Sequence, residues 1–293
     1  MFYAYVSLET FKRYYYLTKP GIIQGNLITA TAGFLLASPQ NIDLPLLLAT
    51  LLGTALIIAS GCVFNNYMDR NIDQKMARTK KRALVIKTIP PRKAMIFASI
   101  LGLVGLGVLA RYVSWLVVAI GLIGFVAYVF VYGYAKRHSV HSTLVGTISG
   151  ATPVVAGYCA ASGQFDGAAL ILFAILLTWQ MAHFYGIAMY RHDDYKAAGI
   201  PLLPVIKGMR ITKAQTVVYI FGFVVATSLL TLYGHTGYSY LAVTLALGLV
   251  WLFRALSTFN QKDDRLWGRK TFLFSLIVLL VTSVMLSVGT RLP

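Results

Sequence analysis

The sequence predicts an all-α membrane protein: a single domain, residues 1–293, built as a bundle of about nine transmembrane helices. Three observations support this fold class. Hydrophobic residues make up 58% of the chain, and its mean hydropathy is +0.71. Only 12% of the residues are charged, and they cluster between apolar runs. Those runs are spaced too closely to leave room for a separate soluble domain.

Nine apolar runs are long enough, or nearly so, to cross about 30 Å of hydrocarbon. The first begins at Pro20, which suits the first turn of a helix, and three tyrosines at 14–16 precede it as an interfacial belt. Asp43 and Asp166 stand where the second and sixth runs begin, so we expect both to cap helices. In order, the runs cover roughly 20–38, 44–66, 94–110, 112–134, 142–161, 167–190, 214–234, 237–258 and 270–290.

The basic residues predict the orientation of the bundle. With the N-terminus in the cytoplasm, 24 of the 26 Lys and Arg residues fall on the cytoplasmic side, and only Arg111 and Arg291 lie outside. Because basic loops stay on the cytoplasmic side of a membrane, this distribution favours a cytoplasmic N-terminus. An odd number of spans then places Pro293 on the outer side.

The same topology explains the net charge of +17 without a nucleic acid, since anionic lipid attracts basic loops. Cys62 and Cys159 both fall within apolar runs and indicate neither a disulfide framework nor a zinc site. Residues 1–19 lack the apolar core of a cleavable signal, and no Arg- and Ser-rich transit peptide is evident. These features favour the inner (plasma) membrane of a bacterium.

Asn65, Asp69 and Asp73 form the most informative pattern, four residues apart where the second run meets the most basic loop. On a helix this spacing drifts by about 40° and rises about 6 Å per step, so the three side chains share one stripe. Acids are scarce, with 9 Asp and Glu against 26 Lys and Arg, and a helix C-terminus disfavours them. We therefore predict these three as catalytic residues and Mg²⁺ ligands. The alternative is that the acids pair with neighbouring bases in a solvated loop.

A second acidic site, Asp193 and Asp194, follows the sixth run on the same membrane face. Two acidic sites mixed with Lys and Arg predict a pocket for a Mg²⁺-bound lipid diphosphate, with its tail among apolar helices. The bases within 78–82 also serve as topology determinants, and the second acidic pair alone could be an ordinary solvated loop. The candidate diphosphate-binding residues are Asn66, Arg70, Arg78, Lys81, Arg137, Asp194 and Lys196.

Gln180 and His183 lie three residues apart within the sixth run and share a helix face. A polar pair at membrane depth must be hydrogen-bonded or face a cavity. One interpretation is a hydrogen bond between helices. The other is contact with a flat substrate or with haem iron, for which neutral imidazole is a good ligand. Both residues are therefore candidate haem-binding residues.

The motif Asn65-x3-Asp69-x3-Asp73 is similar to the first aspartate motif of the UbiA-like intramembrane prenyltransferases. The segments LTKPGII at 17–23, ASGCVFNNY at 59–67, MART at 76–79 and AGIPLLPV at 198–205 resemble the protohaem IX farnesyltransferase branch of that superfamily. The likeness extends from about residue 16 to residue 285. Ala182 and Thr152 stand where that family usually carries proline.

This resemblance implies that a farnesyl group passes from farnesyl diphosphate to a vinyl group of haem b, giving haem O for terminal oxidases. It also implies Mg²⁺ as the cofactor and membrane lipid as the surroundings. Association with haem A synthase or with terminal oxidase assembly is a further expectation. Two other functions stay open: prenylation of a quinone precursor or another aromatic acceptor, and a non-catalytic carrier of haem or lipid.

Overall fold

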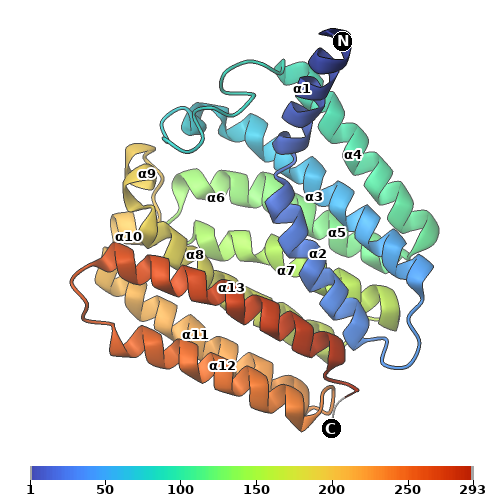
Figure 1. Cartoon of the computed structure of the whole chain (residues 1–293), viewed down its shortest axis with the longest axis vertical. Coiled ribbons are helices and arrows are strands. Elements are labelled where there is room, and N and C mark those ends of the chain that lie inside the picture. The colour runs from blue at the N-terminus through green and yellow to red at the C-terminus, as the bar shows by residue number, and fades with distance from the viewer. Residues whose placement is uncertain (1, 292–293) are drawn as a thin grey trace.

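The computed structural model describes residues 2–291, and over these residues it consists of helices joined by turns and loops, without strands. The helices form one bundle (Figure 1). In chain order they are α1 (Phe2–Leu17), α2 (Pro20–Leu36), α3 (Leu44–Asp73), α4 (Pro91–Tyr112), α5 (Trp115–Val126), the π-helical turn η1 (Ala127–Tyr132), α6 (Gly133–His138), α7 (Ser142–Ser162), α8 (Gly167–Tyr190), α9 (His192–Ala197), α10 (Leu203–Ile206), α11 (Met209–Leu232), α12 (Tyr238–Ser257) and α13 (Asp264–Val288).

Eight helical segments among the described residues are long and apolar enough to cross a membrane, which confirms a multi-pass membrane protein. They are α3, α4, the continuous segment Trp115–His138 made of α5, η1 and α6, then α7, α8, α11, α12 and α13. The first predicted span corresponds to α2, which has 17 residues and packs against α7, α13 and α3 inside the bundle. The count of nine spans, with both termini on the predicted sides, stays a prediction.

The helices are longer than the apolar runs at the basic end of the bundle. α3 ends at Asp73 rather than at residue 66, and α13 begins at Asp264 rather than at 270. Hydropathy marks only the part of a helix that meets hydrocarbon, whereas backbone hydrogen bonding continues into the interface. As a result, the whole motif from Asn65 to Asp73 lies on one helix.

The predicted helix caps are confirmed at the opposite end. The carboxylate of Asp43 accepts a hydrogen bond from the Leu46 backbone N–H at 2.9 Å, and that of Asp166 accepts one from the Ala169 N–H at 3.1 Å. Each bond satisfies a backbone donor that the helix itself leaves free. These two acids therefore have structural partners and lie away from the stripe on α3.

Close contacts between α2 and α7 depend on small residues. A Cβ atom at Gly33 on α2 would overlap the backbone oxygen of Val154 on α7, and one at Gly157 would overlap that of Ala30. Such residues let membrane helices approach closely. α7 continues through Pro153, and α8 is unbroken at Ala182, so the two departures from the family pattern leave both helices intact.

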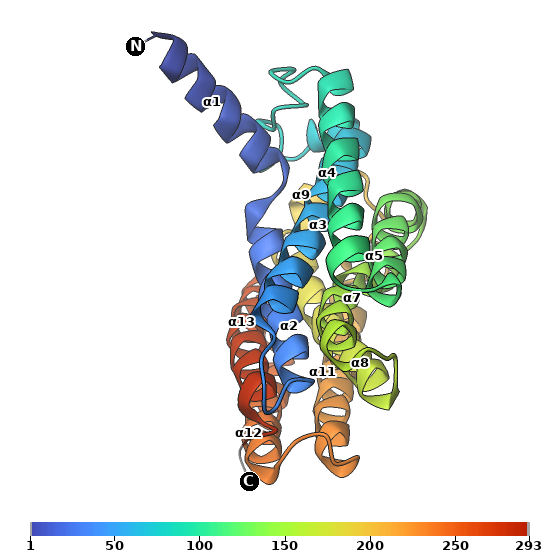
Figure 2. The ribbon, with the colours of Figure 1, turned by 90° about the vertical axis from the view of Figure 1, so that its right-hand side faces the viewer.

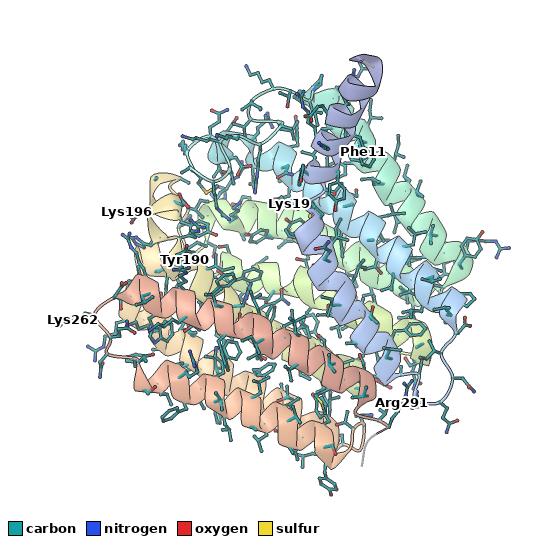
Figure 3. The ribbon with its side chains drawn as sticks, in the orientation of Figure 1. Phe11, Lys19, Tyr190, Lys196, Lys262 and Arg291 are labelled. Carbon is teal, nitrogen blue, oxygen red and sulfur yellow. The ribbon has the colours of Figure 1, made fainter. Side chains whose placement is uncertain are left out.

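The basic connections gather at one end of the bundle. The segment 74–90 and the short helices α9 and α10 lie at the upper left of Figure 1, and the turn between α12 and α13 lies below them along the left edge. Lys196 and Lys262 are at this end, and Arg291 is at the other (Figure 3). α1 projects from the bundle beside the basic connections (Figure 2).

The orientation can be tested with single cysteines in a background where Cys62 and Cys159 are replaced by alanine. Lys81→Cys and Lys207→Cys are exposed positions at the basic end, whereas Asn41→Cys is exposed in the turn between α2 and α3. Because basic loops face the cytoplasm, a membrane-impermeant maleimide added to intact spheroplasts should label only Asn41→Cys. Labelling of Lys81→Cys or Lys207→Cys before the membrane is opened would overturn the predicted orientation.

Candidate functional site

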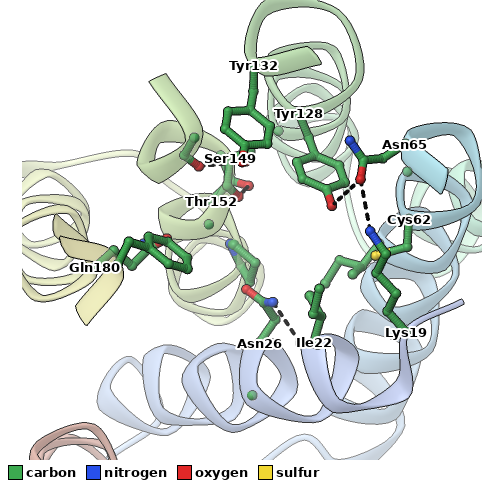
Figure 4. A pocket seen from close by; sticks show the side chains of 18 of the residues that line it. Lys19, Ile22, Asn26, Cys62, Asn65, Tyr128, Tyr132, Ser149, Thr152 and Gln180 are labelled. Atoms are coloured by element: carbon green, nitrogen blue, oxygen red, sulfur yellow. Dashed lines mark hydrogen bonds between the residues drawn. The ribbon is translucent and has the colours of Figure 1, made fainter. Parts of the chain in front are cut away.

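One cavity of about 540 Å³ lies among the helices and joins a polar mouth to an apolar interior. The mouth, at the basic end, is lined by Asp69 and Asp73 together with side chains of the connections that follow α3 and α8. The interior is lined by residues such as Ile57, Leu176 and Leu279. Figure 4 shows the α3 wall facing Gln180 of α8 across the cavity. This form suits an amphipathic ligand with an anionic head.

The stripe on α3 supplies buried carboxylates to the mouth. Asp69 and Asp73 are each 1% exposed. One oxygen of each is paired with a base: Lys136 Nζ lies 2.6 Å from Asp69 Oδ2, and Arg82 Nη1 lies 2.7 Å from Asp73 Oδ2. The other oxygen, Oδ1, is buried and has no hydrogen-bond partner in either residue. Two carboxylate oxygens are therefore available to a cation.

These donors fit Mg²⁺ better than a metal held by protein ligands alone. Among the described residues, no group of three or more His, Cys, Asp or Glu side chains gathers into a metal site. The available oxygen donors are the two unpartnered carboxylate oxygens, whereas the amide oxygen of Asn65 already accepts hydrogen bonds and would have to exchange them for a metal. Mg²⁺ is commonly held by one or two carboxylates and completed by water and substrate phosphates.

Asn65 at the inner end of the stripe is held by two donors. Its Oδ1 accepts hydrogen bonds from Lys19 Nζ at 2.9 Å and from the Tyr128 hydroxyl at 3.4 Å (Figure 4). Lys19 joins α1 to α2 with a φ of 56°, a left-handed conformation that is uncommon for a residue with a side chain. Burial lowers the pKa of the Lys19 ammonium from 10.5 to about 8, so a nearby anion would favour its charged form.

A second stripe, on η1 and α6, faces the first. Tyr128, Tyr132 and Lys136 are spaced by four residues, and all three line the cavity. The two tyrosine rings stack with centroids 5.9 Å apart. These tyrosines were not among the predicted site residues, although their spacing repeats that of the stripe on α3. π-Helical turns are frequent at functional sites.

Six of the predicted site residues line the cavity, and six do not. The structure brings together Asn65, Asp69, Asp73, Arg78, Gln180 and His183. It places outside the cavity lining Asn66, Arg70, Lys81, Arg137, Asp194 and Lys196.

Local contacts explain why two of these polar residues near α3 turn away. The Asn66 side chain donates to the Leu17 backbone oxygen at 2.8 Å and so joins α3 to α1. The Arg70 guanidinium lies 4.3 Å from the ring centroid of Tyr67 and donates to the Tyr67 backbone oxygen at 2.7 Å. Both side chains therefore have structural partners of their own.

The remaining four lie in the connections. Lys81 is exposed, and its neighbour Arg82 reaches the carboxylate instead. Arg137 donates to the Met68 backbone oxygen and stays 3.8 Å from Asp69, so the closer cation is Lys136. Asp194 is half-buried, and the Lys196 side chain is exposed on α9 (Figure 3). The cations at the mouth are thus mostly neighbours of the predicted ones.

Arg78 connects the two basic segments across the mouth. Its guanidinium donates to the Tyr195 hydroxyl at 3.1 Å and lies 5.4 Å from the Tyr195 ring centroid. Both residues line the cavity. The connection after α3 and the short helix α9 therefore meet above the carboxylates, although they are far apart in sequence.

At the deep end of the cavity, the sequence left two interpretations open for Gln180 and His183: a structural hydrogen bond or contact with a ligand. The structure is compatible with both. His183 Nδ1 lies 2.7 Å from the hydroxyl oxygen of Ser275, which is a hydrogen bond between α8 and α13. Gln180 donates to the Leu176 backbone oxygen at 3.1 Å. Both side chains also line the cavity, so their structural bonds do not remove them from a ligand's reach.

Comparison with known proteins identifies one family. The model of the UbiA prenyltransferase family matches residues 26–277. A protoheme IX farnesyltransferase of Photorhabdus laumondii is 51% identical over 283 residues, covering 96% of each chain. One of Klebsiella pneumoniae is 51% identical over 284 residues, covering 97% of this chain and 96% of that one.

Solved structures show the same fold at low identity. A structure described as digeranylgeranylglyceryl phosphate synthase matches with a TM-score of 0.80 at 19% identity, over 97% of this chain and 100% of that one. A UbiA homolog from Archaeoglobus fulgidus bound to GPP and Mg²⁺ matches with a TM-score of 0.70 at 15% identity, over 94% and 99%. At such identities the likeness concerns the fold alone.

The pairing of Asp69 can be tested with Lys136→Met. The lysine side chain is 13% exposed and the aspartate 1%, so its removal leaves a buried carboxylate with only the more distant Arg137 guanidinium, 3.8 Å away. We expect a loss of about 2–3 kcal/mol in stability, read as a lower apparent melting temperature in detergent. Because Mg²⁺ can replace the missing charge, it should raise the melting temperature of this variant more than that of the wild type.

Arg137→Met is the matched control, because the Arg137 side chain is 39% exposed and its guanidinium lies 3.8 Å from the same carboxylate. This variant should keep nearly the wild-type melting temperature and nearly the wild-type shift of that temperature with Mg²⁺. An equal Mg²⁺ shift in the wild type and both variants would show that Lys136 does not occupy a cation site.

Proposed function

This chain belongs to the UbiA prenyltransferase family, and from this premise we propose that it transfers the farnesyl group of farnesyl diphosphate to a vinyl group of protohaem IX. The product is haem O. The observation that carries the choice of acceptor is the 51% identity, over 96% of both chains, to a protein named protoheme IX farnesyltransferase. Identity at this level favours haem over a quinone precursor, and an enzyme over a carrier.

The mouth of the cavity supports the binding of a diphosphate. Asp69, Asp73 and Asn65 would hold Mg²⁺, which when bound neutralises diphosphate charge and makes it a better leaving group. Lys19, Arg82 and Lys136 already lie against these three side chains. Their N–H groups can donate to phosphate oxygens once a ligand is present. An anionic head would thus meet cations that the fold has placed in advance.

The apolar interior supports the transfer itself. Breaking the bond between the farnesyl C1 and the diphosphate oxygen leaves an allylic cation, and an apolar lining limits its capture by water. The terminal vinyl carbon of the porphyrin then forms the new carbon–carbon bond. A water molecule adds to the other vinyl carbon and loses a proton, which completes the hydroxyethylfarnesyl group. We propose that the acceptor meets the prenyl chain beside His183 and Gln180, which line the cavity.

The setting of the reaction follows from the bundle and its relatives. The chain is a multi-pass membrane protein, and the similar farnesyltransferases are bacterial. We place it in the bacterial inner membrane, where farnesyl diphosphate and haem b would enter the same cavity. Association with haem A synthase or with terminal oxidase assembly stays a prediction from the resemblance.

The proposed function is tested by turnover of the purified protein with farnesyl diphosphate, haem b and Mg²⁺. Mass spectrometry should detect haem O, because the chain is 51% identical to proteins named protoheme IX farnesyltransferase. The same assay with aromatic quinone precursors in place of haem should give little product. A prenylated ring product in the absence of haem O would overturn the haem assignment, and haem binding without any transfer would indicate a carrier.

The role of the carboxylates is tested by Asp69→Ala and Asp73→Ala. Each change removes a metal-binding oxygen and electrostatic stabilisation of the leaving group, so turnover should fall by at least about 100-fold. Size-exclusion profiles should show that both variants remain folded.

Asp193→Asn serves as the control, since that carboxylate pairs with Arg265 at the surface, 2.8 Å away, and does not line the cavity. It should retain nearly full activity. Near-wild-type turnover of both alanine variants at saturating Mg²⁺ would remove the metal-site hypothesis.

A further inference from the structure

Ser275 on α13 connects two helices at the deep end of the cavity. Its hydroxyl oxygen lies 2.6 Å from the Phe272 backbone oxygen, one turn earlier in the same helix, and 2.7 Å from His183 Nδ1 on α8. Its own backbone oxygen accepts a hydrogen bond from Trp179 Nε1 at 2.8 Å. Ser275 is completely buried, so water cannot substitute for these partners.

These contacts determine which nitrogen of His183 carries hydrogen. The serine hydroxyl has one hydrogen, and a backbone carbonyl only accepts, so the 2.6 Å contact requires that hydrogen to point at Phe272. The hydroxyl oxygen is then left to accept from His183. Nδ1 must therefore carry the hydrogen, and Nε2 of the neutral ring has a free lone pair.

The ring of His183 is also fixed in orientation. It stacks on Trp179 with centroids 4.6 Å apart, meets the edge of Phe184 at 5.2 Å and lies 5.0 Å from the ring of Phe272. No Asp or Glu among the described residues pairs with it, so nothing compensates a charged imidazolium there. Nε2 makes no hydrogen bond with any described residue, while the side chain lines the cavity.

A purely structural histidine would leave this nitrogen unexplained. A hydrogen bond between α8 and α13 needs only Nδ1, and an apolar side chain could pack between the same aromatic rings. Nε2 is not sealed within the protein but keeps an accessible surface on the cavity side, where a ligand can use its lone pair. The ligand chemistry that fits an oriented, neutral imidazole with a free Nε2 is a transition-metal ion, and iron in a flat porphyrin also suits the aromatic surroundings.

We propose that Ser275 is a positioning residue that holds His183 in the Nδ1-protonated form, so that Nε2 binds the iron of the haem acceptor. Metal-binding histidines commonly donate their other ring N–H to a fixed acceptor, which orients the ring and strengthens the donor nitrogen. The inference rests on the proposed function in taking haem as the acceptor. Coordination would centre the porphyrin over His183 and so limit which of its edges meets the farnesyl chain.

The experiment measures iron coordination in the full-length protein without farnesyl diphosphate. Ferrous haem b and metal-free protoporphyrin IX are titrated separately, and resonance Raman spectra record the iron–histidine vibration. Ser275→Ala should weaken haem binding by roughly 10- to 100-fold and lower the frequency of that vibration, while metal-free porphyrin binds as before. His183→Ala should abolish the vibration.

Two further variants separate positioning from folding. Ser275→Thr keeps a hydroxyl that can donate to the carbonyl one turn earlier, so it should restore both haem affinity and the vibration. Ser60→Ala removes another fully buried serine, whose hydroxyl donates to the Ala98 backbone oxygen at 2.7 Å between α3 and α4. It should leave both quantities at wild-type values.

An unchanged iron–histidine vibration in His183→Ala or in Ser275→Ala would overturn the proposal. Equal weakening of haem and metal-free porphyrin by Ser275→Ala would also do so, because that result indicates a general packing defect. A parallel assay for haem O separates this inference from the proposed function. Absence of haem O from the wild type would refute the function, whereas the coordination spectra report on His183 and Ser275 alone.

Discussion

The rest of the site depends on the burial of two carboxylates at the end of a membrane helix. Asp69 and Asp73 are almost fully buried, and a buried charge is tolerated only when a partner compensates it. The partners, Lys136 and Arg82, come from α6 and from the connection after α3. Compensation therefore requires three separate parts of the chain to converge on one stripe, which defines the mouth of the cavity.

The same requirement prepares the mouth for an anion. Arg82 and Lys136 pair with the two carboxylates, and Lys19 donates to the Asn65 amide oxygen, so these bases occupy acceptor groups that a metal would otherwise use. If a cation bound the carboxylates, as proposed, these bases would become free to face phosphate oxygens, so the cation and the bases together would meet the charge of the diphosphate. The apolar interior behind them lacks such charges, so in the proposed reaction diphosphate release and carbon–carbon bond formation would take place in different surroundings.

The deep end depends on how closely two helices approach. A Cβ atom at Gly186 on α8 or Gly268 on α13 would meet the other helix at about 3 Å or less. This close contact brings Ser275 within hydrogen-bond distance of His183 and Trp179. The two glycines therefore permit the hydrogen bonds of Ser275 further along the same helix pair. Without those bonds, a buried imidazole would lack a partner, which would be costly.

Patterns that are local in the chain were readable from the sequence alone. Apolar length predicted the helical membrane fold, acids before apolar runs predicted the caps at Asp43 and Asp166, and four-residue spacing predicted the stripe on α3, because each depends on helix geometry within a few residues. Only the tertiary structure decided which bases face that stripe. Lys81 and Arg82 are adjacent bases, and nothing in the sequence tells which of them faces the stripe. Ser275 lies 92 residues from His183 in the chain. Such pairings depend on helix packing and on side-chain direction at each position, which a linear pattern does not contain.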